Sequence, residues 1–165
     1  MKPTPERYYN AIKQMIVDNF NNEITTVYSE CNDDVYQPTF EPDGVFYGSP
    51  QPHNDEHDLS VYLTKADNYT FNGTPTLFST DSKITAVISY REAGFGENNA
   101  EQIMFIMGRL FKALAQSIAK NIEDYECLHW GSLQMASGEE YEEQFDTSND
   151  YTYYEKIIEI SVVSA

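Results

Sequence analysis

Basic residues are scarce in this sequence. Its 165 residues contain 10 Lys and Arg against 27 Asp and Glu, which gives a formal net charge of −17 at pH 7. Affinity for nucleic acid and for anionic membranes comes mainly from Lys and Arg, so direct binding to either is not expected. The charge is compatible with a basic protein partner, with a like-charged channel through which DNA passes without sticking, or with a surface that simply stays soluble.

Cysteine is rare, and long apolar runs are missing. Cys31 and Cys127 belong to neither a CxxC motif nor a close Cys/His pair, so metal and redox chemistry at sulfur have little support. Two free thiols in a reducing compartment are expected, with a disulfide between them left open. The first residues lack the apolar stretch of a signal peptide, and no segment reaches the roughly 18 apolar residues of a membrane span. We therefore expect a protein made in the cytosol, with no membrane contact.

Motifs for catalysis are missing as well. Residues 93–96 contain two glycines, but neither the Lys-Ser/Thr of a phosphate-binding loop nor a dinucleotide-binding spacing follows. His129 lies in an apolar stretch, and no Ser or Cys has a nucleophile motif around it, so a packed histidine is expected there. The sequence predicts no enzyme, no catalytic residue and no cofactor.

A metal-like cluster occurs at residues 53–58, which read HNDEHD. His53 and His57 are spaced i, i+4 and would share an ion on a helix. Pro50 and Pro52 precede them, however, and no second ligand group follows at the spacing of a zinc protease. We interpret the cluster as an acidic, solvated loop and predict no metal.

Aromatic and apolar residues are plentiful by contrast. Hydrophobic residues make up 41% of the chain, with 13 Tyr and 9 Phe. This length suits a single domain over residues 1–165, which can bury a core without a metal or a disulfide.

Periodicity predicts the order of the elements. A helix should start at Pro5, with Thr4 as its cap, and a second should start after an Asn98 cap paired with Glu101. The apolar stripe of that second helix includes Leu110, and Met104 should widen it. The predicted elements are a helix over 5–20, a strand over 24–29, a strand over 58–64 with a turn at 65–68 and a return at 69–71, a further turn at 72–73, a strand over 83–91, a helix over 98–121, a strand over 127–135, an exposed acidic connection over 137–150 and a strand over 154–163.

These elements indicate an α+β fold. We expect an antiparallel or mixed β-sheet with a long amphipathic helix and a short N-terminal helix packed on one face.

Residues 31–58, called the arm below, have a different composition. The arm holds four of the seven prolines and shows no helical period, so we predict a long loop with one short strand, of a kind that is often functional. Its aromatic residues should pack on their own domain or on a neighbour. These candidate interface residues are Tyr36, Phe40, Phe46 and Tyr47.

Four further residues are candidates for an interface. Tyr151 and Tyr153 belong to a tyrosine-rich stretch that fits ordinary packing and an intersubunit surface equally well. Arg91 and Arg109 are conspicuous because bases are scarce, and we expect them to pair with acids within the chain or across an interface.

The arrangement of elements resembles that of tailed-phage tail terminators, the neck proteins that cap the tail tube. The shared features are a short N-terminal helix leading into a strand, a β-meander that ends here in KITAVISYRE, a long amphipathic helix (AEQIMFIMGRLFKALAQSIAK) and a terminal strand preceded by aromatics (NDYTYYEKIIEISVV). The arm departs from the shortest members of the family.

The resemblance implies a virion protein that forms a hexameric ring without catalysis or cofactor. Its partners would be the tail tube protein and a head-side connector or stopper protein, and DNA would pass through without specific binding. An acidic inner wall would let a duplex slide. Two alternatives remain open: a small acidic inhibitor or DNA mimic that binds a basic nucleic-acid enzyme, and another phage neck, connector or tail structural protein.

Overall fold

The fold begins with one long helix rather than with a short helix and a strand. The computed structural model describes residues 5–50, 53, 56–71, 78–92, 98–121, 132–137, 142–146 and 151–164. Within these ranges, helix α1 (Pro5–Ser29) spans 25 residues. The predicted helix end at Phe20 and the predicted strand over 24–29 are therefore wrong, while Thr4, the predicted cap, lies outside the described residues.

The helix continues because its apolar spacing does. Ile24, Val27 and Tyr28 follow Phe20 at helical intervals and are buried in the core. The hydroxyls of Thr25 and Thr26 donate to the carbonyl oxygens of the residues four positions earlier, so these β-favouring side chains are accommodated on the exposed face. Residue type suggested a strand, whereas the spacing of the buried positions decided for the helix.

A six-stranded sheet forms the second layer. Its order is β1-β2-β3-β6-β4, and β5 also pairs with β6. The β1–β2 pair is parallel and all other pairs are antiparallel, so the sheet is mixed, as predicted. The strands are β1 (Val45–Tyr47), β2 (Leu59–Phe71), β3 (Phe78–Arg91), β4 (Ser132–Ser137), β5 (Glu142–Asp146) and β6 (Tyr151–Ser164).

Strand β2 runs straight through the predicted turn at 65–68. It pairs with β3 over its whole length, from Leu59 opposite Tyr90 to Phe71 opposite Phe78. Two of the polar residues that suggested a turn bond to each other within the strand, since Lys65 Nζ donates to the Asp67 carboxylate at 2.7 Å. The other oxygen of Asp67 accepts a hydrogen bond from Ser82 of β3. The predicted turn at 72–73 falls outside the described residues.

The C-terminal part of the chain contains more strand than expected. Residues 137–150 were predicted to be an exposed connection, but β5 lies within them and pairs with the first residues of β6. Strand β4 pairs with the end of β6. Strand β6 begins at Tyr151 and not at Tyr154, since its first residues pair with β5 and the pairing with β3 begins at Tyr153. Most of the predicted strand over 127–135, including Trp130, lies outside the described residues.

Helix α2 (Ala100–Ala119) carries the predicted apolar stripe. Its cap is Asn99 rather than Asn98: the Asn99 side chain accepts from the Gln102 backbone N–H, and the Gln102 side chain accepts from the Asn99 N–H. Met104 was expected to widen the buried stripe but is 47% exposed. The buried apolar residues of α2 are Ile103, Ile106, Met107, Leu110, Ala113, Leu114 and Ile118.

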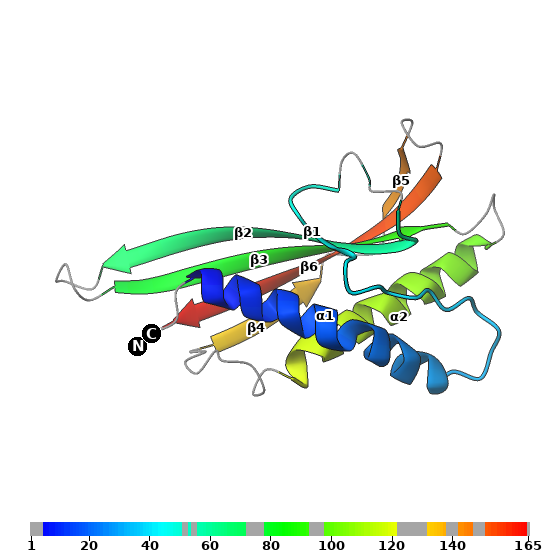
Figure 1. Ribbon diagram of the computed structural model, residues 1–165, viewed down its shortest axis with the longest axis horizontal. Helices are drawn as coiled ribbons and strands as arrows, with labels where there is room; N and C mark the ends of the chain where they lie inside the picture. The colour runs from blue at the N-terminus through cyan, green and yellow to red at the C-terminus, as the bar shows by residue number, and fades with distance from the viewer. Residues whose placement is uncertain are drawn as a thin grey trace.

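Both helices cover one face of the sheet, as the sequence predicted (Figure 1). Helix α1 contacts β1, β2 and β3, and α2 contacts α1, β3 and β6. Alternate residues of the central strands point into this layer, which explains their burial. The strand residues of the core include Leu59, Val61, Leu63, Ile84, Ala86, Ile88, Tyr90, Ile158, Ile160 and Val162. Neither helix in the described part of the chain is long and apolar enough to cross a membrane.

The arm covers part of the opposite face of the sheet. Ser60 and Ser89 point to that face and are nevertheless buried, as is Tyr153 of β6. His53 of the arm stacks on the Tyr153 ring, with the ring centroids 3.9 Å apart and the planes nearly parallel. The prediction of a loop with one short strand is confirmed for the arm, and much of the loop packs on its own domain.

Candidate functional site

The sequence cluster at residues 53–58 is divided by the fold. His53 turns to the sheet, where its Nε2 lies 2.5 Å from an oxygen of Glu155 and its side chain is fully buried. His57 instead lies beside the first part of the arm, with Phe46 as a ring neighbour at 6.3 Å. The two imidazoles therefore do not form the shared site that their i, i+4 spacing suggested.

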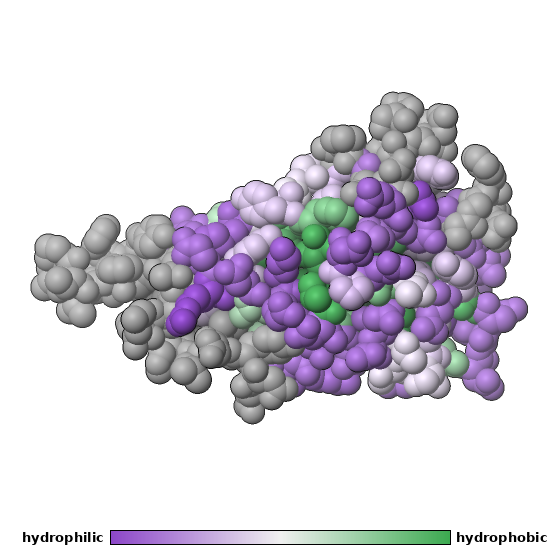
Figure 2. All heavy atoms as spheres, viewed as in Figure 1, coloured by the Kyte–Doolittle hydropathy of each residue, from purple (hydrophilic) through white to green (hydrophobic). Residues whose placement is uncertain are grey.

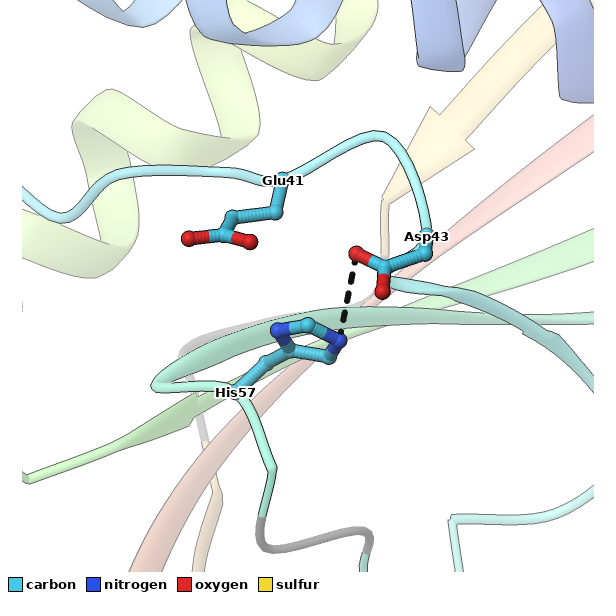
Figure 3. A group of neighbouring side chains, drawn as sticks. All are labelled: Glu41, Asp43 and His57. Carbon is cyan, nitrogen blue, oxygen red and sulfur yellow. Dashed lines mark ion pairs between the residues drawn. The ribbon is translucent and has the colours of Figure 1, made fainter.

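His57 meets two carboxylates that the sequence analysis did not single out. Its Nε2 lies 3.3 Å from Asp43 Oδ1, and ligand atoms of Glu41, Asp43 and His57 all lie within 4.8 Å of one another. Figure 3 shows both carboxylates on the same side of the imidazole ring, with a dashed line for the ion pair between Asp43 and His57. Within the described ranges, this is the grouping of His, Cys, Asp and Glu side chains that could hold a metal ion.

A tight turn positions the two carboxylates. The Gly44 N–H donates to the Glu41 carbonyl at 2.8 Å, and the Gly44 carbonyl accepts from Val61 at 2.9 Å. A Cβ on Gly44 would lie 3.0 Å from the Glu41 carbonyl oxygen and 3.2 Å from that of Leu59, so a larger residue would crowd the backbone there. No local motif marked this site, because its members come from opposite ends of a segment that doubles back.

Arg91 is held inside the chain. Its guanidinium donates to Asp58 Oδ1 from Nη2 at 2.7 Å and from Nε at 3.2 Å, and it lies 4.6 Å from the centroid of the Tyr151 ring. Burial is the largest single effect and lowers the pKa of Arg91, but the hydrogen bond and charge of Asp58, with smaller contributions from Tyr153 and Tyr151, together raise this pKa above its usual value. The prediction that this arginine pairs with an acid is confirmed, and the pair joins the end of the arm to β3.

Arg109 is also paired within the chain. Both of its terminal nitrogens donate to Asp33, at 3.1 and 2.5 Å, and the guanidinium lies 4.8 Å from the centroid of the Tyr28 ring. Burial raises the pKa of Tyr28 to about 12, against the opposing effect of Arg109. The Tyr28 hydroxyl donates to the Tyr36 carbonyl at 2.6 Å. Arg109 thus links α2 to the start of the arm.

The aromatic candidates differ widely in exposure. Tyr47 is 73% exposed, Tyr36 40% and Tyr151 37%. Phe40 is buried against Phe20, with ring centroids 4.9 Å apart, and Tyr153 is buried beneath His53. Phe46 is half-buried beside Tyr62. Tyr36, Tyr47 and Tyr151 are thus the aromatic candidates with exposed side chains. Phe40 packs in the core, and Tyr153 is buried under His53 on the opposite face of the sheet.

Three exposed apolar side chains were not among the candidates. Met104 and Phe105 lie on α2, exposed by 47% and 38%, and Ile157 lies on β6, exposed by 42%. The alternation of β6 placed Ile157 on the outer face, so that position was available from the sequence; Phe105 was missed because the helical stripe was extended toward Met104 instead. Figure 2 shows a mainly hydrophilic surface on the helical side, with a hydrophobic patch near the level of β1 in Figure 1.

The remaining sulfur and histidine candidates are only partly covered by the structure. Cys31 is a half-buried free thiol whose sulfur lies 3.5 Å from the Val27 carbonyl oxygen. Cys127 and His129 lie outside the described residues, so their predicted roles stay predictions.

Comparisons with known proteins do not assign the chain to a family. No protein-family model and no curated protein matches the chain. Among solved structures, the fold is similar to a chain of the "Virion of native gene transfer agent (GTA) particle", with a TM-score of 0.33 and 9% identity, over 90% of this chain and 95% of that chain. The likeness is one of outline, and what this protein does has to be derived from its own residues.

Proposed function

We propose that the protein is a structural component of a tailed-phage virion, of the tail terminator type. It would form a hexameric ring at the head–tail junction, meet the tail tube protein on one side and a connector or stopper protein on the other, and act without catalysis. The proposal does not depend on the virion chain named above. Its basis is the part of the shared order of elements that the structure retains, namely strands β2 and β3 followed by the long helix α2 and the terminal strand β6, together with exposed apolar side chains on the surface. The short N-terminal helix leading into a strand does not support it, because α1 is a single long helix.

The observation that carries the proposal is the presence of exposed apolar groups on separate parts of an otherwise acidic surface. Tyr47 lies in the edge strand β1, Met104 and Phe105 lie on α2, and Tyr151 and Ile157 lie on β6. A ring with rotational symmetry needs two different surfaces on each subunit, one for each neighbour. Exposed aromatic and methionine side chains are enriched in the cores of such contacts.

The net charge fits a channel for DNA. Each subunit carries a net charge of −17, and the proposal assigns part of this acidic surface to the lumen, where repulsion of phosphates would let a duplex pass without binding. The same self-repulsion opposes assembly at low ionic strength, because charges are poorly screened there.

Light scattering after size exclusion, over a range of salt, tests the proposal. We expect a species with six times the mass of the 18.9-kDa chain, favoured at higher salt. Tyr47→Ser should reduce the assembled fraction without loss of the helical circular-dichroism signal, since Tyr47 is 73% exposed. Asn68→Ser, an exposed change on the adjacent strand β2, is the control and should assemble normally.

The alternative of an acidic inhibitor is favoured by the charge alone. Exposed carboxylates such as Asp34 and Glu41 could stand in for phosphates in the basic cleft of a nucleic-acid enzyme. That function requires a monomer or dimer that captures a basic enzyme in a salt-sensitive manner. A monomer at every salt concentration, with such capture, would contradict the ring and support the inhibitor.

A further inference from the structure

We propose that Glu41, Asp43 and His57 form a binding site for a divalent transition-metal ion of the zinc class. The proposal concerns the arm and is independent of the proposed virion function. Its starting point is that ligand atoms of the three side chains lie within 4.8 Å of one another. Two carboxylates and an imidazole at such separations can reach one ion, with water completing the coordination.

The state of the imidazole is the second observation. The His57 side chain is only 11% exposed, and its Nε2 is shielded from solvent without a hydrogen-bond partner. The Asp43 oxygen 3.3 Å away is near enough for an ion pair but does not complete a hydrogen bond. A buried polar atom without a partner has lost its hydrogen bond to water and has gained none in exchange, which is unfavourable. An ion on the carboxylate side of the ring would use the Nε2 lone pair and remove this unfavourable state.

The ligand set selects the class of ion. Calcium and magnesium are bound mainly by oxygen atoms and seldom by imidazole. Imidazole suits zinc, copper, iron and nickel, and zinc also accepts carboxylate oxygens. The single nitrogen ligand therefore favours a zinc-class ion over the hard cations. The net charge of −17 raises the local concentration of any cation. The experiment therefore has to distinguish binding at this site from nonspecific attraction of cations to the acidic surface.

Metal binding would tie the arm together. Glu41 and Asp43 precede β1, whereas His57 precedes β2, so one ion would join the chain on both sides of the β1 strand. The site lies beside the Gly44–Val61 backbone bond that anchors the arm to the sheet. An ion that binds only the folded arm stabilises the protein in proportion to the logarithm of its concentration above the dissociation constant.

Histidine NMR tests the site directly. The chain has three histidines, and we expect equimolar Zn²⁺, added to protein freed of metal with EDTA, to shift the imidazole nitrogen signals of His57. The His57→Gln and Asp43→Asn variants should each weaken Zn²⁺ binding in calorimetry at least tenfold. Asp34→Asn, which removes another exposed acid of the arm, is the matched control and should bind as the wild type does.

Several results would overturn the site. Zinc that shifts the signals of other histidines but not of His57 would exclude it, as would variants and control that bind equally. Stronger binding of Ca²⁺ or Mg²⁺ than of Zn²⁺ would contradict the assigned class of ion. Should His57→Gln fail to fold, the double variant Glu41→Gln with Asp43→Asn tests the same site. Both of these side chains are exposed, so their replacement should not disturb folding.

Discussion

At the scale of single residues, Arg91 and Arg109 each form a salt bridge that joins two segments distant in the sequence. Arg109 holds Asp33 through two donors and lies over the Tyr28 ring, so α2, the end of α1 and the start of the arm meet at one side chain. An arginine suits this position because its planar fork can bind a carboxylate and stack on a ring together.

The pair predicts a measurable shift at Asp33. The hydrogen bond from Arg109 is the largest of the effects that lower the Asp33 pKa below the ordinary value of 3.8. A lowered pKa in the folded state means that the pair stabilises the fold at neutral pH, and that this contribution is lost as pH falls through the folded-state pKa. We expect the Asp33 carboxyl to titrate at lower pH in the wild type than in Arg109→Met, as followed by carbon NMR.

Lys112→Met is the control for that titration. Lys112 pairs with Glu30 at 3.1 Å, and both side chains are more than half exposed. Its removal should leave the Asp33 titration unchanged. Equal Asp33 pKa values in the wild type and in Arg109→Met would show that the guanidinium does not hold the carboxylate in solution.

At the scale of elements, the start of α2 shows how a shift of one residue changes which side chains cap the helix. Asn98 and Asn99 are both good caps by residue type, but only Asn99 exchanges hydrogen bonds with the third helical residue, Gln102. Asn98 instead donates from its side chain to the Tyr90 hydroxyl at 3.4 Å, a weaker contact. Residue type alone therefore permits either asparagine as the cap, and the structure has the register with Asn99 and Gln102.

This assignment predicts the cost of removing each asparagine. Asn99→Ala should lower the free energy of unfolding by about 1 kcal/mol, the usual cost of a lost cap. Asn98→Ala should cost clearly less, because the 3.4 Å contact is long for a hydrogen bond. Urea denaturation of the two variants beside the wild type measures both values. A larger loss of unfolding free energy for Asn98→Ala than for Asn99→Ala would indicate that Asn98 is the cap, as the sequence analysis expected.

At the scale of the whole molecule, an excess of negative charge remains after the visible ion pairs are formed. Basic residues that pair with acids in the described structure include Lys65, Lys83, Arg91, Arg109, Lys112 and Lys120. Exposed pairs contribute little each, about 0–1 kcal/mol. The unpaired carboxylates repel one another over distances of about a Debye length, which destabilises the compact state at low salt.

The melting temperature should therefore rise when NaCl is added to a low-salt buffer. Screening of the acidic surface outweighs the loss of the exposed ion pairs, because carboxylates greatly outnumber bases. Calorimetry at several protein concentrations separates this effect from assembly, since a subunit-level effect does not depend on concentration. A melting temperature that is flat or falls with salt would mean that the ion pairs matter more than the repulsion.

Much of the fold follows from local pattern. Ile84, Ala86, Ile88 and Tyr90 occupy alternate positions of the predicted strand over 83–91 and so share one face of it, and all four are fully buried. Helical spacing identified the core stripe of α2, and the helix–strand grouping identified an α+β fold with both helices on one face. The reason is physical: the period of side chains along a strand or helix decides which residues share a face, and that period can be counted in the sequence.

What only the tertiary structure decided is where elements end and which distant residues meet. Residues 24–29 have strand-forming types, but packing in the core kept them in α1. Residues 65–68 have turn-forming types, but pairing with β3 kept them in β2. Glu41, Asp43 and His57 are brought together by a chain that leaves the sheet and returns. Local sequence patterns do not predict such contacts, because the contacts depend on the path of the backbone between the residues. That path is determined by the packing of the whole domain.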